Sequence, residues 1–162
     1  MALLVADSGP LIALARLSLL WLPARLEREV LVTDVVWSEV TRSPRPGELP
    51  MLHDARALGW LAVVPGPEAP DPKLTEAQLD EGELSALSLA LSRSAMVLID
   101  ELRGRTVAAQ CGLQVVGTLG LLLLARERSL VGALRPLVES LQSSGYFLSR
   151  PLIDRVLGSE GE

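Results

Sequence analysis

Cysteine, histidine and aromatic residues are scarce in this chain of 162 residues. Cys111 is the only cysteine, so no disulfide can form within the chain, and a disulfide-stapled scaffold is excluded. Aromatic residues make up 3% of the sequence, which argues against a broad stacking surface for single-stranded nucleic acid. His53 is the only histidine, and we expect it at the surface. A zinc site of nitrogen and sulfur ligands is therefore disfavoured.

Long apolar runs are also missing. The most apolar stretch, residues 113–125, contains two glycines and a threonine and is shorter than the roughly 20 residues that a membrane-spanning helix needs. The opening MALLVADSGP has an acid at position 7 and no basic segment, unlike a secretory signal. We expect a cytoplasmic protein without a membrane partner. With 49% hydrophobic residues, residues 1–162 can form one self-sufficient domain.

Charge is spread unevenly along the chain, whose formal net charge is -5. Residues 102–155 carry seven arginines and three acids, whereas the 101 residues before them carry fifteen acids and eight bases. One interpretation is a phosphate-cleaving site between an acidic and a basic half, because carboxylates hold cations and arginines hold phosphates. The other interpretation is a set of solvated faces with no common role. The sequence leaves both open.

Short apolar runs alternate with longer helical patterns, which is typical of a parallel sheet covered on both faces. We predict strands at residues 3–6, 30–33, 60–64, 96–99 and 114–117.

Helical spacing of apolar residues fills the stretches between the predicted strands. Residues 11–26 read as a helix after Pro10, and shorter helices are expected at about 35–41 and 51–59. Thr75 and Gln78 resemble a capping box that opens a helix running to residue 93. Further helices are predicted at residues 101–112, 118–128, 130–143 and 150–157.

Two acids directly follow predicted strands, where ligands bind in open parallel sheets. Asp7 follows LLVA and Asp100 follows MVLI. Each acid could instead be a simple helix N-cap. Glu39 could be a solvated helix residue, and the crowded acids Asp80, Glu81 and Glu83 could complement a helix dipole. Crowded carboxylates also suggest a cation, so the residues alone do not decide between a metal site and ordinary helix starts.

Taken together, four blocks of sequence resemble a PIN-domain subfamily related to the VapC-type toxin ribonucleases. ADSGPLIALARL is similar to the family's first strand, acid and helix, with Gly9 where serine is common. VTDVVWSEV and LDEGELSALSLA resemble the helices with the second and third acids. In VLIDELRGRTVAAQCGLQVVGTLGLLLLARE, Asp100 matches the fourth acid, Glu101 replaces a frequent second aspartate, and Arg126 stands where lysine is usual.

The resemblance implies a three-layer α/β/α fold with a parallel sheet of about five strands in the order 3-2-1-4-5. Residues 130–158 would form an appended C-terminal helical extension. It also implies an endoribonuclease that uses Mg²⁺ or Mn²⁺ and acts as a toxin-like component of a toxin–antitoxin system. The implied partners are an RNA substrate, an antitoxin protein and a second copy of the chain. The implied catalytic and metal-binding residues are Asp7, Glu39, Glu83 and Asp100.

Four further residues are candidates for contacting the substrate or holding the ligands: Ser8, Glu101, Arg105 and Thr118. The planar fork of Arg105 suits two phosphate oxygens, but the residue could equally form an ion pair with Glu101 on the same helix. Thr118 could donate a hydrogen bond to an acid or to a metal-bound water, or it could cap the following helix.

Two other functions remain open. A phosphoacceptor receiver domain also places acids and a threonine after parallel strands, but it needs a lysine after the last strand, and Lys73 lies elsewhere. A binding module for nucleic acid or protein could keep the acidic pocket without turnover. No glycine-rich phosphate loop is present, so nucleotide-dependent enzymes are disfavoured.

Overall fold

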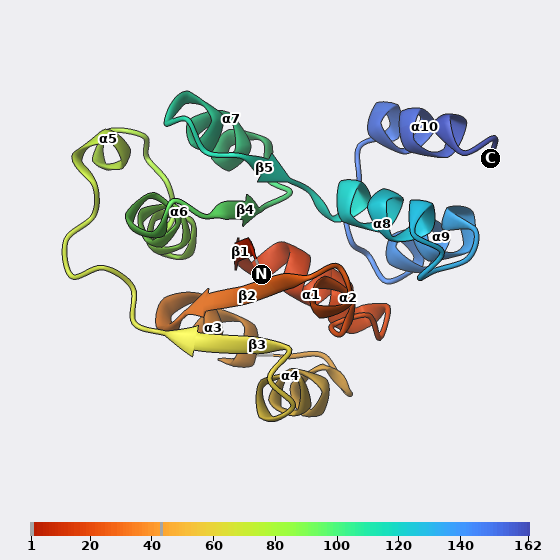
Figure 1. The fold of residues 1–162 in the computed structure, drawn as a ribbon, viewed down its shortest axis with the longest axis horizontal. Helices are drawn as coiled ribbons and strands as arrows, with labels where there is room; N and C mark the ends of the chain where they lie inside the picture. The colour runs from red at the N-terminus through yellow and green to blue at the C-terminus, as the bar shows by residue number, and fades with distance from the viewer. Residues whose placement is uncertain (1, 43) are drawn as a thin grey trace.

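The computed structural model describes residues 2–42 and 44–162, and it contains a five-stranded parallel sheet (Figure 1). The strand order is β3-β2-β1-β4-β5, which confirms the predicted fold class. The strands are β1 (Ala2–Ala6), β2 (Arg28–Thr33), β3 (Leu61–Val64), β4 (Met96–Leu98) and β5 (Val115–Val116). Because parallel crossovers are right-handed, connections that run from β1 towards β3 and those from β3 towards β5 lie on opposite faces.

Ten helices surround this sheet within the described residues, and they give a three-layer α/β/α arrangement. They are α1 (Ser8–Arg16), α2 (Leu22–Arg25), α3 (Asp34–Arg42), α4 (Glu48–Ala57), α5 (Pro72–Thr75), α6 (Glu81–Arg93), α7 (Leu102–Gln110), α8 (Thr118–Glu127), α9 (Leu134–Ser143) and α10 (Arg150–Ser159). None of the described helices is both long and apolar enough to cross a membrane.

The continuous helix predicted for residues 11–26 is wrong. Helix α1 ends at Arg16, and Ser18 adopts a positive φ of 56°, which breaks the helix before α2 begins at Leu22. Leu19 and Leu20 in the connection are nevertheless buried. These two leucines are apolar because the loop packs against the core. Their spacing happens to match that of a helix, which explains the wrong prediction.

The capping box predicted at Thr75 and Gln78 is also misplaced. Thr75 is the last residue of the short helix α5, and Gln78 has a positive φ of 52°. The capping box that opens α6 is formed by Asp80 and Glu83, in which each side chain accepts a hydrogen bond from the other residue's backbone N–H. This shift matters for the site, because it brings Asp80 to the start of α6.

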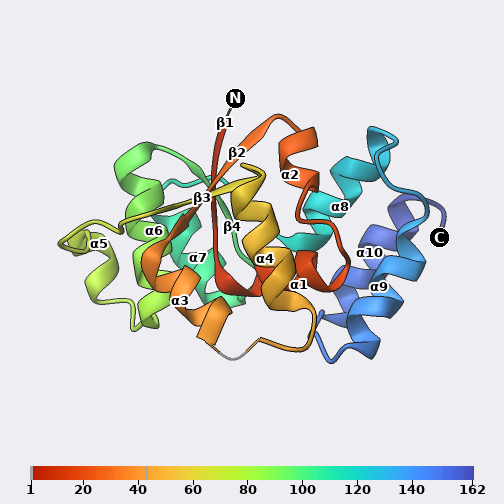
Figure 2. The same cartoon turned by 90° about the horizontal axis from the view of Figure 1, so that it is seen from below.

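Helices α9 and α10 lie with α8 at one end of the molecule, opposite α5 and α6 (Figures 1 and 2). They are attached through the buried residues Leu134, Val138, Ile153, Val156 and Leu157, which belong to the main hydrophobic core. The Glu162 carboxylate accepts hydrogen bonds of 2.9 Å from the backbone N–H groups of Leu134 and Arg135. The C-terminal helices are thus packed against the remainder of the chain.

We predict that Leu87→Ala destabilises the protein by about 2–5 kcal/mol, because Leu87 is fully buried on α6 and its truncation leaves a cavity. Leu58→Ala is the matched control, since Leu58 is 63% exposed and should change the free energy of unfolding by only about 0.5 kcal/mol. Denaturant unfolding measures both. Equal stabilities of the two variants would show that α6 does not pack as described.

Candidate metal-binding and active site

The carboxyl ends of β1 and β4 meet at one edge of the sheet. The backbone N–H of Asp7 donates to the carbonyl of Leu98 at 3.0 Å, which joins the two strand ends. Asp7 directly follows β1, and Asp100 lies two residues beyond β4. The strands thereby bring together two carboxylates that are far apart in the sequence, as expected for an open parallel sheet.

A cavity of about 350 Å³ opens at this edge, and acidic side chains dominate its polar lining. Three of the four predicted acids line it, whereas Glu83 does not. Asp80, from the acidic cluster noted in the sequence, lines it as well, and so do Tyr146 and Phe147, which the sequence did not connect to a site. The complete lining is Asp7, Ser8, Gly9, Pro10, Glu39, Asp80, Asp100, Glu101, Tyr146 and Phe147.

Asp7 is a buried carboxyl group with only 7% of its surface exposed. It occupies the N-cap position of α1, but its side chain makes no capping hydrogen bond, so capping does not explain it. Burial, with smaller contributions from the negative charges of Asp80, Glu39 and Asp100, raises the pKa of Asp7 to about 6 against the opposing effect of the Ser8 backbone N–H. The ionised form of Asp7 is therefore disfavoured in the metal-free cavity.

Asp100 is held by three hydrogen-bond donors. Its Oδ1 accepts the Thr118 backbone N–H at 2.7 Å, and its Oδ2 accepts both the Thr118 hydroxyl at 2.6 Å and the Tyr146 hydroxyl. Burial and the adjacent Asp100 charge raise the pKa of Tyr146, so its phenol remains a donor. Neither Asp100 nor Thr118 is a helix N-cap, because the N-cap of α7 is Glu101 and the N-cap of α8 is Gly117.

Glu39 reaches the cavity from α3 and is fixed by two neighbours. The Ser8 hydroxyl donates to Glu39 Oε2 at 2.6 Å. On the other side the Glu39 carboxylate packs against Gly82 in the first turn of α6, where an added Cβ would lie 2.6 Å from Glu39 Oε1. Only glycine at position 82 leaves room for the carboxylate in this place.

Glu83 is buried behind the cavity wall and pairs with Glu101. Besides its capping-box contact, its carboxyl group hydrogen-bonds Glu101. Burial, this hydrogen bond and the charge of Asp80 raise the pKa of Glu83 to about 7. Slight burial of Glu101 is outweighed by the hydrogen bonds from the Gly104 N–H and from Glu83, so the pKa of Glu101 is lowered. A proton bound by this pair therefore favours Glu83 over Glu101.

Arg105 approaches the same edge from α7. A Cβ added at Gly117 would lie 2.9 Å from Asp100 Oδ1 and 3.2 Å from Arg105 Nη1, so the two side chains flank Gly117. Among the described residues, ion pairs occur at Arg16–Glu48 and Arg150–Asp154, and the alternative pairing of Arg105 with Glu101 is not formed.

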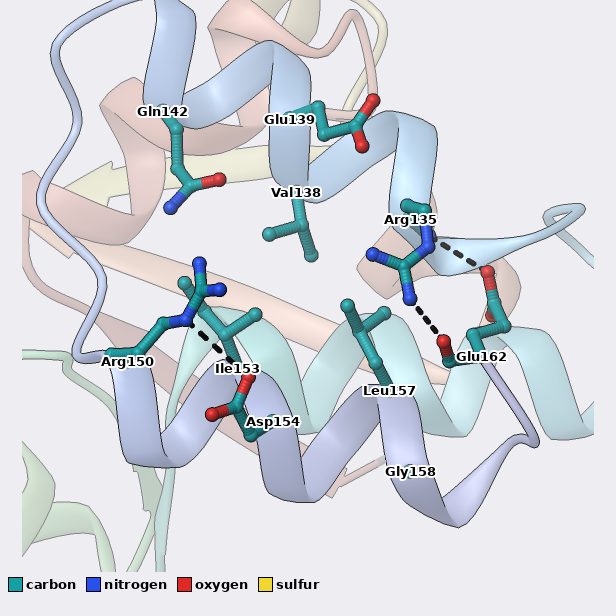
Figure 3. A pocket seen from close by; sticks show the side chains of 10 residues that line it. All are labelled: Arg135, Val138, Glu139, Gln142, Arg150, Ile153, Asp154, Leu157, Gly158 and Glu162. Atoms are coloured by element: carbon teal, nitrogen blue, oxygen red, sulfur yellow. Dashed lines mark hydrogen bonds and ion pairs between the residues drawn. The ribbon is translucent and has the colours of Figure 1, made fainter.

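The other arginines of the basic C-terminal half do not gather at this cavity. Arg135 and Arg150 line a separate pocket between α9 and α10, where Arg135 contacts Glu162 and Arg150 contacts Asp154 at 3.5 Å (Figure 3). The Arg135 guanidinium donates to the main-chain oxygen of Glu162, and Arg150 is paired with the Asp154 carboxylate. None of the seven arginines of residues 102–155 lines the acidic cavity, and Arg105 is the one found beside Asp100 at its edge.

The cavity fits a hard divalent cation by its donor chemistry. Its acidic lining offers carboxylate oxygens, which Mg²⁺ and Mn²⁺ prefer, and no arginine, lysine or histidine of the described chain lines the cavity to balance their charge. Within residues 2–42 and 44–162, however, no three acidic, histidine or cysteine side chains are already arranged closely enough to enclose an ion. An ion would therefore draw the carboxylates together.

The residues that sequence reasoning missed differ in the signals they carry. Asp80 belonged to a recognised acidic cluster, and its N-cap position could have been found from the Asp-x-x-Glu spacing. Tyr146 lies 46 residues beyond Asp100, on the connection between α9 and α10, and no local pattern points from one to the other.

Comparison with known families identifies the chain. The model of the family DUF3368, described as a PIN domain, matches residues 3–162. The chain belongs to this PIN-domain family. PIN domains are generally nuclease folds and typically bind divalent metals.

Two solved structures share the fold. One is a PilT N-terminus domain protein, SSO1118, from the hyperthermophilic archaeon Sulfolobus solfataricus P2, with 14% identity and a TM-score of 0.57 over 74% of this chain and 90% of that chain. The other is PAE2754 from Pyrobaculum aerophilum, with 17% identity and a TM-score of 0.51 over 77% of this chain and 90% of that chain. At these identities the likeness establishes the fold alone. No curated protein matches the sequence.

We predict that the metal-free protein loses stability as the pH rises from about 4 to 8. Because the pKa of Asp7 is raised from 3.8 to about 6, the folded protein keeps a proton that the unfolded chain has released. The stabilisation is fully present below about pH 4 and is lost as the pH rises through 6. Glu83, whose pKa is raised to about 7, acts in the same direction, whereas its partner Glu101, whose pKa is lowered, acts in the opposite direction and offsets part of the effect. Asp7 alone should contribute roughly 3 kcal/mol of this change.

Denaturant unfolding in EDTA across this pH range, on the wild type and on Asp7→Asn, measures the effect. The asparagine side chain of this variant cannot ionise, so the variant should show a flatter pH dependence. Identical pH profiles for the two proteins would contradict the burial and crowding inferred for Asp7.

Proposed function

We propose that this protein is a Mg²⁺- or Mn²⁺-dependent endoribonuclease that hydrolyses RNA phosphodiester bonds at the acidic cavity. The observation that carries the proposal is the convergence of Asp7, Glu39 and Asp100 on one cavity from three separate segments of the chain. Membership of a family that is generally nuclease in character supports the same reaction class.

In this proposal Asp7, Glu39 and Asp100 hold the metal, and their neighbours keep the carboxylates in place. Thr118 fixes the orientation of Asp100 through two hydrogen bonds, and Ser8 fixes that of Glu39. Orientation of this kind commonly contributes roughly 10- to 100-fold to metal affinity or activity. When bound, the divalent ion lowers the pKa of a water and neutralises charge on the phosphate.

Glu83, Glu101 and Arg105 take supporting roles. Glu101 lines the cavity and shares a proton with Glu83, so the pair can orient a water molecule and exchange a proton near neutral pH. Arg105, beside Asp100, is placed to hold a phosphate oxygen of the substrate. Glu83 acts through Glu101 in this account, because it does not line the cavity itself.

The biological setting proposed is that of a cytoplasmic toxin-like ribonuclease restrained by an antitoxin protein and working as a homodimer. This part rests on the resemblance of the sequence blocks to VapC-type toxins. It is separate from the chemistry of the cavity, which requires neither partner.

A binding module without turnover is the second candidate. Two observations favour it: Asp100 already accepts three hydrogen bonds, and the described residues do not enclose an ion without rearrangement. The receiver-domain alternative gains no support, because Lys73 is exposed on α5 and does not line the acidic cavity.

We predict that Mn²⁺-dependent cleavage of fluorescent single-stranded RNA falls at least about 100-fold in Asp7→Asn and in Asp100→Asn, because each removes a proposed ligand. Asp54→Asn, an exposed acid on α4, is the matched control and should cleave like the wild type. All proteins are purified in parallel to reveal contaminating ribonuclease. Unchanged cleavage in both site variants would refute the proposal, and Mn²⁺ binding without any cleavage would favour the binding module.

We also predict that Gly82→Ala weakens Mn²⁺ binding several-fold while leaving thermal stability nearly unchanged. The new Cβ would displace the Glu39 carboxylate, which is the far end of a flexible side chain, so the backbone need not move. Gly132→Ala is the control, because nothing lies within 4 Å of its added Cβ. Equal Mn²⁺ affinity in both variants would show that Glu39 does not act at the site.

A further inference from the structure

We propose that Tyr146, carried by the C-terminal helical extension, is a positioning residue that fixes the Asp100 carboxylate for metal binding. The inference rests on the proposed function, since it concerns the same acidic cavity. It extends the site to the connection between α9 and α10, within the C-terminal helical extension.

The two carboxylate oxygens of Asp100 accept different numbers of hydrogen bonds. A carboxylate oxygen has about two lone pairs for accepting hydrogen bonds or binding cations. Oδ2 accepts the hydroxyls of Thr118 and Tyr146, so its capacity is filled, whereas Oδ1 accepts only the Thr118 N–H. Tyr146 therefore adds to the restraint that Thr118 places on rotation of the carboxylate, and it leaves Oδ1 as the oxygen with a free lone pair.

The space for the phenol is provided by Gly9 on α1. An added Cβ at Gly9 would lie 3.1 Å from the Tyr146 hydroxyl oxygen, which is closer than ordinary van der Waals contact. A larger residue at position 9 would push the phenol away from Asp100. Glycine at position 9 thus leaves the space that the Tyr146 hydroxyl needs in order to reach Asp100.

The connection that carries Tyr146 is anchored independently of the acidic cavity. Arg16 Nη1 donates to the Ser144 carbonyl at 3.3 Å and to the Ser144 hydroxyl at 3.2 Å, and Arg45 also donates to that carbonyl. Arg16 is itself paired with the buried Glu48 at 3.0 Å. These contacts tie the start of the connection to α1 and α4, so Tyr146 is placed by several parts of the fold at once.

A positive φ of 86° at Gly145 then turns the chain towards the cavity. The Tyr146 backbone N–H donates to the Leu141 carbonyl at 3.0 Å, which closes the end of α9. The phenol thus projects from a turn with defined backbone hydrogen bonds, and a side chain on such a support can restrain Asp100.

Tyr146→Phe tests the inference, because it removes the hydroxyl and keeps the ring. We predict that Mn²⁺ affinity, measured from the electron paramagnetic resonance signal of free Mn²⁺, falls about 10-fold, the range expected when a ligand loses its orienting hydrogen bond. The Mn²⁺ concentration that half-activates RNA cleavage should rise by the same factor. Ser143→Ala, which removes an exposed hydroxyl at the end of α9, is the control and should bind Mn²⁺ like the wild type.

Gly9→Ala gives a second, independent test. It should weaken Mn²⁺ binding several-fold in the wild-type background, because the new methyl group crowds the phenol oxygen. In the Tyr146→Phe background that oxygen is gone, so Gly9→Ala should cause no further loss. Such non-additivity would tie both residues to one contact, whereas a general structural defect would give additive losses.

Two results would overturn the inference while leaving the proposed function intact: wild-type Mn²⁺ affinity in Tyr146→Phe, or tighter binding, which would mean that the phenol competes with the ion. A wild-type protein that binds no Mn²⁺ would instead remove the proposed function, and this inference with it. The melting temperature of each variant in EDTA shows whether the fold is retained.

Discussion

The arrangement of the site depends on the mutual repulsion of carboxylates at one edge of the sheet. Five acidic residues line the cavity where β1 and β4 end, and the buried Asp7 has its pKa raised by burial and by three neighbouring acids. A fold that gathers negative charge in this way gives up stability in the metal-free state. A divalent cation bound in the cavity, as proposed, would relieve that repulsion and offset the cost.

The structure around the carboxylates serves to hold them in place. Asp100 is bound by Thr118 and Tyr146, Glu39 by Ser8, and Glu101 by the start of α7 and by Glu83. Gly9, Gly82 and Gly117 leave space at the positions where a side chain would collide with Tyr146, Glu39 or Asp100. The strands bring the acids together, and the hydrogen-bond donors and glycines around them set the direction in which each carboxylate points.

Much of the fold followed from the sequence, because apolar runs and helical periodicity report burial directly. The strand positions, the strand order implied by the family resemblance, and the placement of Asp7 and Asp100 after strands all agree with the structure. The break at Ser18 and the start of α6 were mispredicted, because Leu19 and Leu20 are buried without being helical and because Thr75–Gln78 and Asp80–Glu83 both have the spacing of a capping box. The contact between Tyr146 and Asp100 could not be predicted, since it depends on how α9 and α10 pack and leaves no local signal.

A crystal structure of the wild-type protein soaked in Mn²⁺, with anomalous scattering data, tests the central claim most directly. The account predicts an anomalous peak inside the cavity, within coordination distance of oxygens from Asp7 and Asp100. A well-ordered cavity without such a peak, in crystals that take up Mn²⁺ elsewhere, would contradict the claim that these carboxylates gather to hold a cation.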